Sequence, residues 1–165
     1  MLHLYSKACE YALRALCQLP RLGNPVRFQA AALCELAEIP EPFTRKVFQS
    51  LVQAGILKAL RGPGGGYEFA RPVSEISLLD VVLAIDGEHA FDVCAMGLSM
   101  CGRHNPCPLH DAWAPFKSRL VEELRQKTLG DLLEFAARGA NAMDKQGAVR
   151  ICLCQAGVHS CSGHA

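Results

Sequence analysis

Residues 42–70, PFTRKVFQSLVQAGILKALRGPGGGYEFA, combine a helical pattern with a hairpin pattern and indicate the fold. Along the first half of this stretch, apolar residues recur at intervals of four, four and three, which predicts one inward face of a helix. They are Phe43, Val47, Leu51 and Ala54. Pro42 stands where proline favours the start of a helix. The polar and basic residues between the apolar ones are expected to face out, namely Thr44, Arg45, Lys46 and Gln49.

The second half of the stretch predicts a β-hairpin. Residues 56–60 and 67–70 have the character of two short strands, and RGPGGG at 61–66 between them suits only a tight turn. Another helix, over residues 28–38, ends before Pro40. Two short helices followed directly by a hairpin are the pattern of a winged helix-turn-helix, with Arg61 placed to reach DNA phosphate or the minor groove. Without the hairpin, the two helices alone would be equally consistent with ordinary packing.

Helices are predicted on both sides of this unit. An amphipathic helix ends at Pro20 and carries Glu10 and Arg14 four residues apart, a spacing typical of a surface ion pair. Helices over 77–86, about 111–127 and 128–135 follow. The helix over about 111–127 needs a partner for its apolar stripe, either within the chain or in a dimer. That stripe consists of Trp113, Phe116, Leu120 and Leu124.

The predicted architecture is mainly α with a small β-hairpin wing and a long dimerisation helix. Residues 1–75 form the DNA-binding domain, 76–138 the cysteine loop and dimerisation helices, and 139–165 a flexible tail. Half of the 165 residues are hydrophobic, yet no apolar run reaches membrane-spanning length and no signal peptide opens the chain. We therefore expect a cytoplasmic protein without a membrane partner. Residues 1–75 hold nine Lys/Arg and six Asp/Glu, which fits DNA contact.

The cysteines indicate metal or redox chemistry, because nine of them in a reducing compartment seldom form disulfides. Cys94, Cys101 and Cys107 lie in the glycine- and proline-rich segment CAMGLSMCGRHNPCPLH, residues 94–110, which predicts a long loop. Three soft thiolates suit an iron–sulfur cluster. Zinc is the main competitor, since Cys107-x-x-His110 matches half a zinc site, although the loop lacks a close Cys-x-x-Cys pair. A metal-free thiol switch is the third alternative.

Together these segments resemble the Rrf family of winged-helix regulators, which includes the cluster-biogenesis regulator IscR and the nitric-oxide sensor NsrR. The match covers about residues 4–135. It lies in YALRAL at 11–16, PFTRKVFQSLVQAGIL at 42–57, RGPGGGYEFARP at 61–72, ISLLDVVLAIDG at 76–87, the cysteine loop and TLGDLL at 128–133. The tail, with Cys152, Cys154, His159, Cys161 and His164, is not covered, and we expect it to be mostly disordered.

The resemblance implies a homodimeric transcription factor that binds a two-fold related operator and senses redox state, nitric oxide or iron–sulfur status. It also implies a cluster held by Cys94, Cys101 and Cys107 with a fourth ligand. That ligand is His110 by similarity to the IscR branch, or Glu10 from the partner subunit by similarity to other branches. A two-iron cluster is favoured and a four-iron cluster is the alternative.

The resemblance also suggests how the chain reads DNA. Thr44, Arg45, Lys46 and Gln49 are expected in the major groove, with Arg45 and Gln49 reaching base edges and Arg61 anchoring the wing. No catalytic constellation appears, so we do not expect an enzyme. The rival class is an iron–sulfur or metal carrier that binds no operator.

Overall fold

The computed structural model describes residues 5–23, 25–102 and 104–138, and it begins with a capped helix. In α1 (Lys7–Leu16), the Ser6 hydroxyl accepts a hydrogen bond from the Cys9 backbone N–H at 3.2 Å, which satisfies one of the free donors of the first turn. The helix ends at Leu16, not at Pro20 as predicted. Pro20 lies instead in a separate short 3-10 turn, η1 (Leu19–Leu22), where its missing N–H costs nothing.

The predicted pair of helices is confirmed as α2 (Ala30–Ala37) and α3 (Glu41–Gln53). The inward face of α3 is rotated from the predicted one. Its buried residues are Thr44, Val47, Phe48 and Leu51. Phe43 is 40% exposed at the edge of the helix, with its ring edge-on to Tyr11 at 5.5 Å between centroids, and Ala54 is exposed. Both had been predicted to face inward.

The predicted hairpin is confirmed by two antiparallel strands, β1 (Leu57–Leu60) and β2 (Gly66–Phe69), in which Leu57 pairs with Phe69 and Leu60 with Gly66. Phe28 pairs with the hairpin although we predicted it to start a helix. Its N–H donates to the Tyr67 carbonyl at 2.9 Å, and its carbonyl accepts from the Tyr67 N–H at 2.8 Å. A side chain at position 66 would collide with the Phe28 carbonyl, so this close approach requires glycine there.

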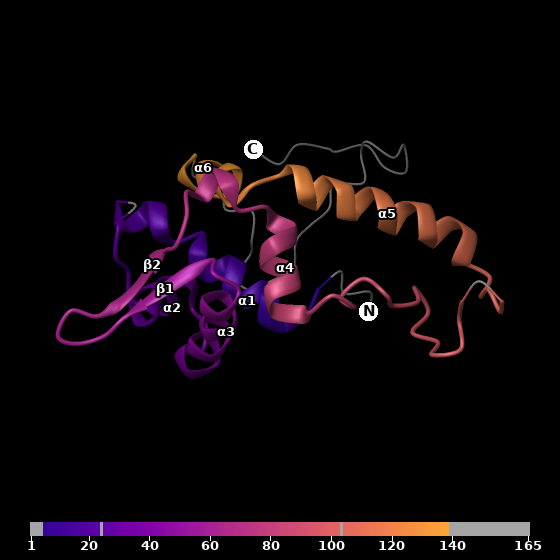
Figure 1. Ribbon diagram of the computed structural model, residues 1–165, viewed down its shortest axis with the longest axis horizontal. Coiled ribbons are helices and arrows are strands. Elements are labelled where there is room, and N and C mark those ends of the chain that lie inside the picture. Colours follow the sequence, from indigo (N-terminus) through magenta and orange to yellow (C-terminus); the bar gives the residue numbers. More distant parts are fainter. Residues whose placement is uncertain (1–4, 24, 103, 139–165) are drawn as a thin grey trace, which may run out of the picture.

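The rest of the described chain consists of η2 (Val73–Glu75), α4 (Leu78–Asp86), α5 (His110–Gln126) and α6 (Leu129–Ala137). Capping boxes start α4 and α6, through Ser77 with Asp80 and Thr128 with Asp131. In Figure 1, α6 lies against the body of the molecule while α5 runs out along the cysteine loop, away from the hairpin. Among the described residues, no helix is long and apolar enough to cross a membrane.

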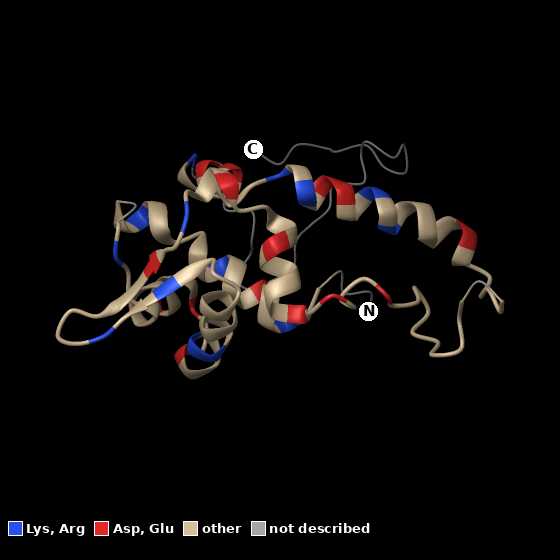
Figure 2. Cartoon of the chain, in the orientation of Figure 1, with Lys and Arg blue, Asp and Glu red and all other residues tan. Residues whose placement is uncertain are grey.

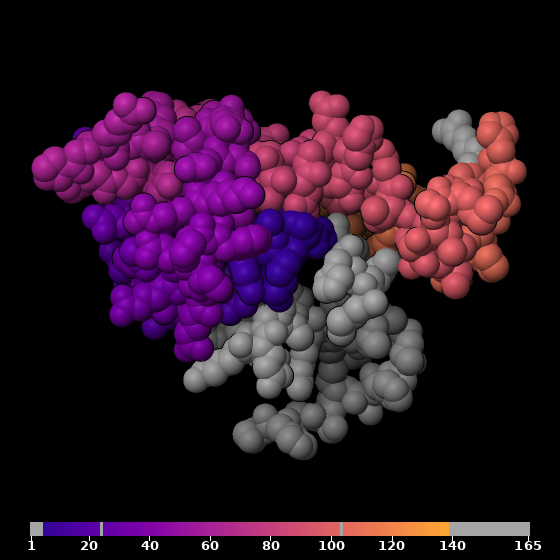
Figure 3. Space-filling model, turned by 90° about the horizontal axis from the view of Figure 1, so that it is seen from below, coloured from indigo at the N-terminus to yellow at the C-terminus, as the bar shows by residue number. Residues whose placement is uncertain are grey.

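One hydrophobic core unites α1, α2, α3, β1 and α4, and Leu129 of α6 also belongs to it. Its largest fully buried side chain is Phe48, whose ring meets that of Tyr67 edge-on at 5.2 Å between centroids. By contrast, none of the described residues of α5 is buried. Figure 3 shows the loop and the first part of α5, in salmon and orange, projecting from the body. The cysteine loop is therefore carried outside the core.

Candidate metal centre and nucleic-acid interface

The three cysteine side chains of the long loop lie close together. One ligand atom each from Cys94, Cys101 and Cys107 lies within 4.8 Å of the other two, and all three side chains are half-buried. The Cys94 and Cys107 sulfurs are 3.5 Å apart. Residues up to 13 positions apart thus present their thiols to one point.

His110 joins the thiols from the first residue of α5, where its ring Nδ1 lies 3.4 Å from the Cys101 sulfur. The loop is tied to the same helix by Trp113, whose indole N–H donates to the Val93 carbonyl at 2.9 Å. The sulfurs and the histidine open onto a pocket between the loop and α5. Its lining also includes Asp92, Val93, Gly102, Trp113, Ala114, Lys117 and Ser118.

Cys94 of the loop ionises more easily than Cys107 of the same loop or Cys9 of α1. The Leu98 and Met96 backbone amides hydrogen-bond the Cys94 sulfur, the latter at 3.4 Å, and they lower the pKa of Cys94 to about 7. Burial raises the pKa of Cys107, so Cys94 is the first of this pair to ionise. In α1, burial and then the Asp86 charge raise the pKa of Cys9 to about 12. Of Cys94, Cys107 and Cys9, only Cys94 therefore has a pKa near neutral pH.

The donor set fits a soft metal centre. Thiolate and imidazole are the ligands of zinc, of mononuclear iron and of iron–sulfur clusters. With metal–sulfur bonds of about 2.3 Å, the sulfurs of a tetrahedral ion lie roughly 3.8 Å apart, which is close to the Cys94–Cys107 spacing. In a two-iron cluster, two cysteines on one iron would keep this spacing, and the third sulfur, on the other iron, would have to lie farther from both. None of the described residues in 94–109 belongs to the hydrophobic core.

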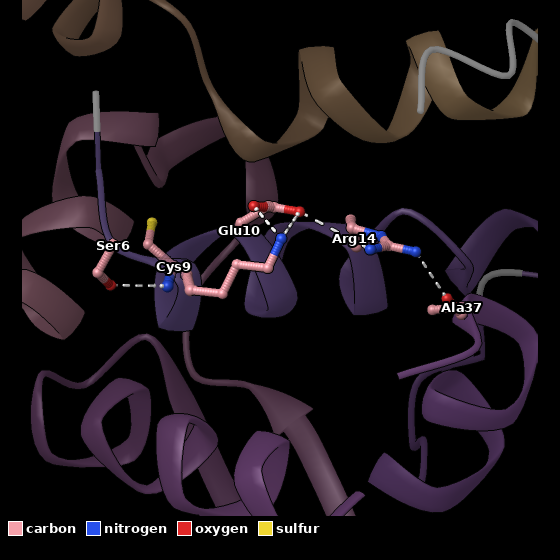
Figure 4. Close-up of polar contacts among 6 residues, drawn as sticks. Ser6, Cys9, Glu10, Arg14 and Ala37 are labelled. Atoms are coloured by element: carbon pink, nitrogen blue, oxygen red, sulfur yellow. Dashed lines mark hydrogen bonds and ion pairs between the residues drawn. The ribbon is translucent and has the colours of Figure 1, made fainter. Parts of the chain in front are cut away.

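Glu10, the other candidate for the fourth ligand, is engaged within its own helix. Its carboxylate lies 2.9 Å from the Lys7 ammonium and 3.7 Å from the Arg14 guanidinium (Figure 4). The predicted Glu10–Arg14 pair is therefore present, but it is not a surface pair, because the two side chains are only 13% and 12% exposed. Arg14 in turn donates to the Ala37 carbonyl at 3.0 Å. Within one chain, His110 is the residue that the structure brings to the thiols.

The polar face of α3 carries most of the predicted DNA contacts. Arg45, Lys46 and Gln49 are exposed as predicted, and so is Arg61 at the turn of the hairpin. Figure 2 shows blue basic segments on both α3 and the hairpin, at the same end of the molecule. The Arg45 Nε lies 2.6 Å from a Glu41 carboxylate oxygen, an exposed pair that costs little to open.

Thr44 corrects the prediction, because it is fully buried and cannot face the major groove. Its hydroxyl donates to the Pro40 carbonyl at 3.1 Å, one turn earlier in the chain. This bond satisfies the hydroxyl inside the core, so a polar side chain occupies a position that we had assigned to the outer face.

The thiol loop and α1 are joined at the end of α4. Asp86 is the last residue of α4 and directly precedes the loop. Its carboxylate accepts a hydrogen bond from the Ser6 N–H at 2.7 Å and another from the Ser6 hydroxyl. Since Ser6 caps α1, and α1 packs on α2 and α3, a continuous series of contacts joins the residue before the loop to the predicted DNA-contacting helix.

The sequence reasoning missed two pocket residues, Trp113 as a hydrogen-bond donor to the loop and Lys117. The available signal was their spacing from His110. At three and seven residues further along a helix, they share its face. The cysteines and histidines predicted in the tail lie outside the described residues.

Comparison with known proteins places this geometry in a family. Residues 5–134 match the model of the Rrf2 family, described as an iron-dependent transcriptional regulator. The transcriptional regulator IscR of Vibrio atlanticus (strain LGP32) is 28% identical over 125 residues, 76% of this chain and 72% of that protein. A relative from Mycobacterium tuberculosis (strain ATCC 25618 / H37Rv), of the HTH-type regulator class, is 33% identical over 128 residues, 77% of this chain and 79% of its own.

Solved structures share the fold. CymR, the global cysteine regulator of B. subtilis, superposes with a TM-score of 0.64 at 19% identity, covering 82% of this chain and 98% of that one. IscR of T. potens has a TM-score of 0.61 at 22% identity, covering 87% and 95%. Because the family model spans α1 to α6 with the hairpin and the three-cysteine loop between them, the chain belongs to the Rrf2 family of transcriptional regulators.

Proposed function

We propose that this regulator binds operator DNA as a homodimer and senses redox state, nitric oxide or iron–sulfur status through an iron–sulfur cluster. Cys94, Cys101, Cys107 and His110 would hold the cluster, with two-iron nuclearity favoured. The convergence of three thiols and an imidazole at the mouth of one pocket carries the proposal. The family's iron dependence supports iron over zinc.

The ligand assignment favours His110 over Glu10. His110 is already 3.4 Å from a thiol of its own chain, whereas Glu10 would have to leave Lys7 and Arg14 to reach a partner's cluster. An imidazole in place of a fourth thiolate also raises the potential of a cluster and makes that position easier to exchange. These properties suit a sensor whose ligand set changes with conditions.

The dimer proposal rests on α5. None of the apolar side chains of this helix is buried in the described part of the chain, and Phe116 is 49% exposed. A second copy of the helix would cover this face and would place two copies of α3 on successive turns of DNA. Loop displacement would then reach α3 through the Asp86–Ser6 link.

A single mononuclear ion is the second candidate, because the observed spacing of the sulfurs suits a tetrahedral site. To distinguish the cluster from a single ion, the protein is purified without oxygen and studied by absorption and EPR spectroscopy. Iron, sulfide and zinc are assayed on the same sample. Matching iron and sulfide with visible charge-transfer bands is the expected result. Zinc without sulfide, even after reconstitution, would contradict the cluster. His110→Ala is expected to alter the spectrum, and Glu10→Gln to leave it unchanged.

The sensing role is tested by operator affinity with and without the cluster. A duplex selected from a random pool by the loaded protein serves as the probe, and fluorescence anisotropy measures binding. We expect the loaded and cluster-free dimers to differ by at least fivefold, about 1 kcal/mol of coupling. Equal affinities would mean that the centre is purely structural.

Arg45→Ala tests the DNA face. A base-edge contact from arginine is worth about 1–3 kcal/mol, so specific binding should fall roughly 5- to 150-fold, with a smaller loss on unrelated DNA. Arg125→Ala is the matched control, because it removes the same charge from exposed α5. Equal losses on both kinds of DNA would restrict Arg45 to phosphate contact.

A further inference from the structure

A lysine borders the thiol pocket from the same helix face as the histidine. His110, Trp113, Ala114 and Lys117 all line the pocket, and their spacing of three, four and seven residues keeps them on one side of α5. The Lys117 side chain is half-buried there. Among the described residues it forms no ion pair with a carboxylate.

The other charged side chain on the pocket wall is Asp92, which is engaged with a neighbouring histidine. Its carboxylate lies 2.7 Å from the His89 ring Nδ1. Of the described residues on that wall, Lys117 is therefore the one that brings a permanent positive charge. The three cysteines line the same pocket, so the pocket combines one cationic side chain with a ligand set that becomes negative when the thiols ionise.

A positive charge near an iron centre shifts the reduction potential of that centre. One-electron reduction makes the centre more negative by one charge, and a nearby positive charge favours that state. Charge and solvent exposure around the ligands are established means by which proteins set such potentials. Because the lysine is only half-buried, water and salt weaken the effect without removing it.

We propose that Lys117 tunes the iron centre by raising its reduction potential, an inference that rests on the proposed function. In the step concerned, a one-electron reductant such as dithionite loses an electron and the centre gains it. No bond is made or broken in this step, and no proton is transferred. The residue acts by charge alone and does not ligate the metal.

Potentiometric titration with dithionite, followed by absorption and EPR, tests the proposal on the loaded full-length protein. Lys117→Met is expected to lower the midpoint potential. At a fixed applied potential, its ratio of reduced to oxidised centre should fall at least threefold, about 28 mV at 59 mV per decade for one electron. Lys117→Arg keeps the charge and should stay near the wild type. The difference in midpoint potential between the wild type and Lys117→Met should become smaller at high salt.

Arg119→Met is the matched control, since it removes a cation from an exposed position of α5 outside the pocket. An equal shift in this control would mean a bulk charge effect and overturn the proposal. If Lys117→Met loses its metal, Lys117→Gln provides the same comparison with a polar replacement. A loaded variant with unchanged potential overturns this inference alone. Wild-type protein that takes up zinc or no metal overturns the proposed function as well.

Discussion

Cys107→Ala is expected to leave the protein with little iron and sulfide after anaerobic reconstitution. Cys107 supplies one of three converging thiols, and its sulfur lies 3.5 Å from that of Cys94. Mutation of a residue that only hydrogen-bonds a metal ligand lowers metal affinity or activity roughly 10- to 100-fold. Removal of a ligand itself should therefore lower metal affinity by at least that factor. Metal and sulfide assays, with the visible spectrum, measure the effect.

The control for this experiment is Cys17→Ala, which removes a thiol at the end of α1. Burial raises the pKa of Cys17 to about 11, so its thiol stays protonated where Cys94 already ionises. The Cys17 variant should keep its iron. Full iron and sulfide in the Cys107 variant would exclude Cys107 as a ligand and redirect attention to the other donors.

Phe48→Ala is expected to lower the free energy of unfolding by about 3–5 kcal/mol, the usual cost of a cavity left by a large aromatic residue. Phe48 is fully buried, and its ring meets Tyr67 at 5.2 Å and Phe28 at 6.4 Å between centroids. It therefore joins α3 to the hairpin and to the backbone segment that pairs with it. Urea unfolding of the metal-free protein, followed by circular dichroism, measures the loss.

Phe43→Ala provides the comparison on the same helix. Phe43 is 40% exposed and has one aromatic contact, with Tyr11. Its removal should cost about 1 kcal/mol. Similar losses for both phenylalanines would contradict the observed rotation of α3, in which Phe48 faces inward and Phe43 lies at the edge.

Features that depend on local chemistry could be predicted from the amino-acid sequence. The glycines of 61–66 allow only a tight turn, and the hairpin follows from them. The predicted helix over 128–135 is present as α6 and is capped by Thr128 with Asp131, because the capping bonds join residues only three positions apart. The three cysteines lie on a loop because glycine and proline around them exclude regular structure. Each of these conclusions needs only a few neighbouring residues.

Features that depend on contacts between residues far apart in the chain could be found only in the tertiary structure. Helical periodicity tolerates a rotation of one position, so only packing shows that Thr44 is inside and Phe43 at the edge. Phe28 looks like a helix residue until the hairpin supplies a backbone partner 39 positions later. A loop has no period, so spacing could not place the three sulfurs together. Helical spacing puts Lys117 on the same face as His110, but only the folded loop shows that this face borders the pocket.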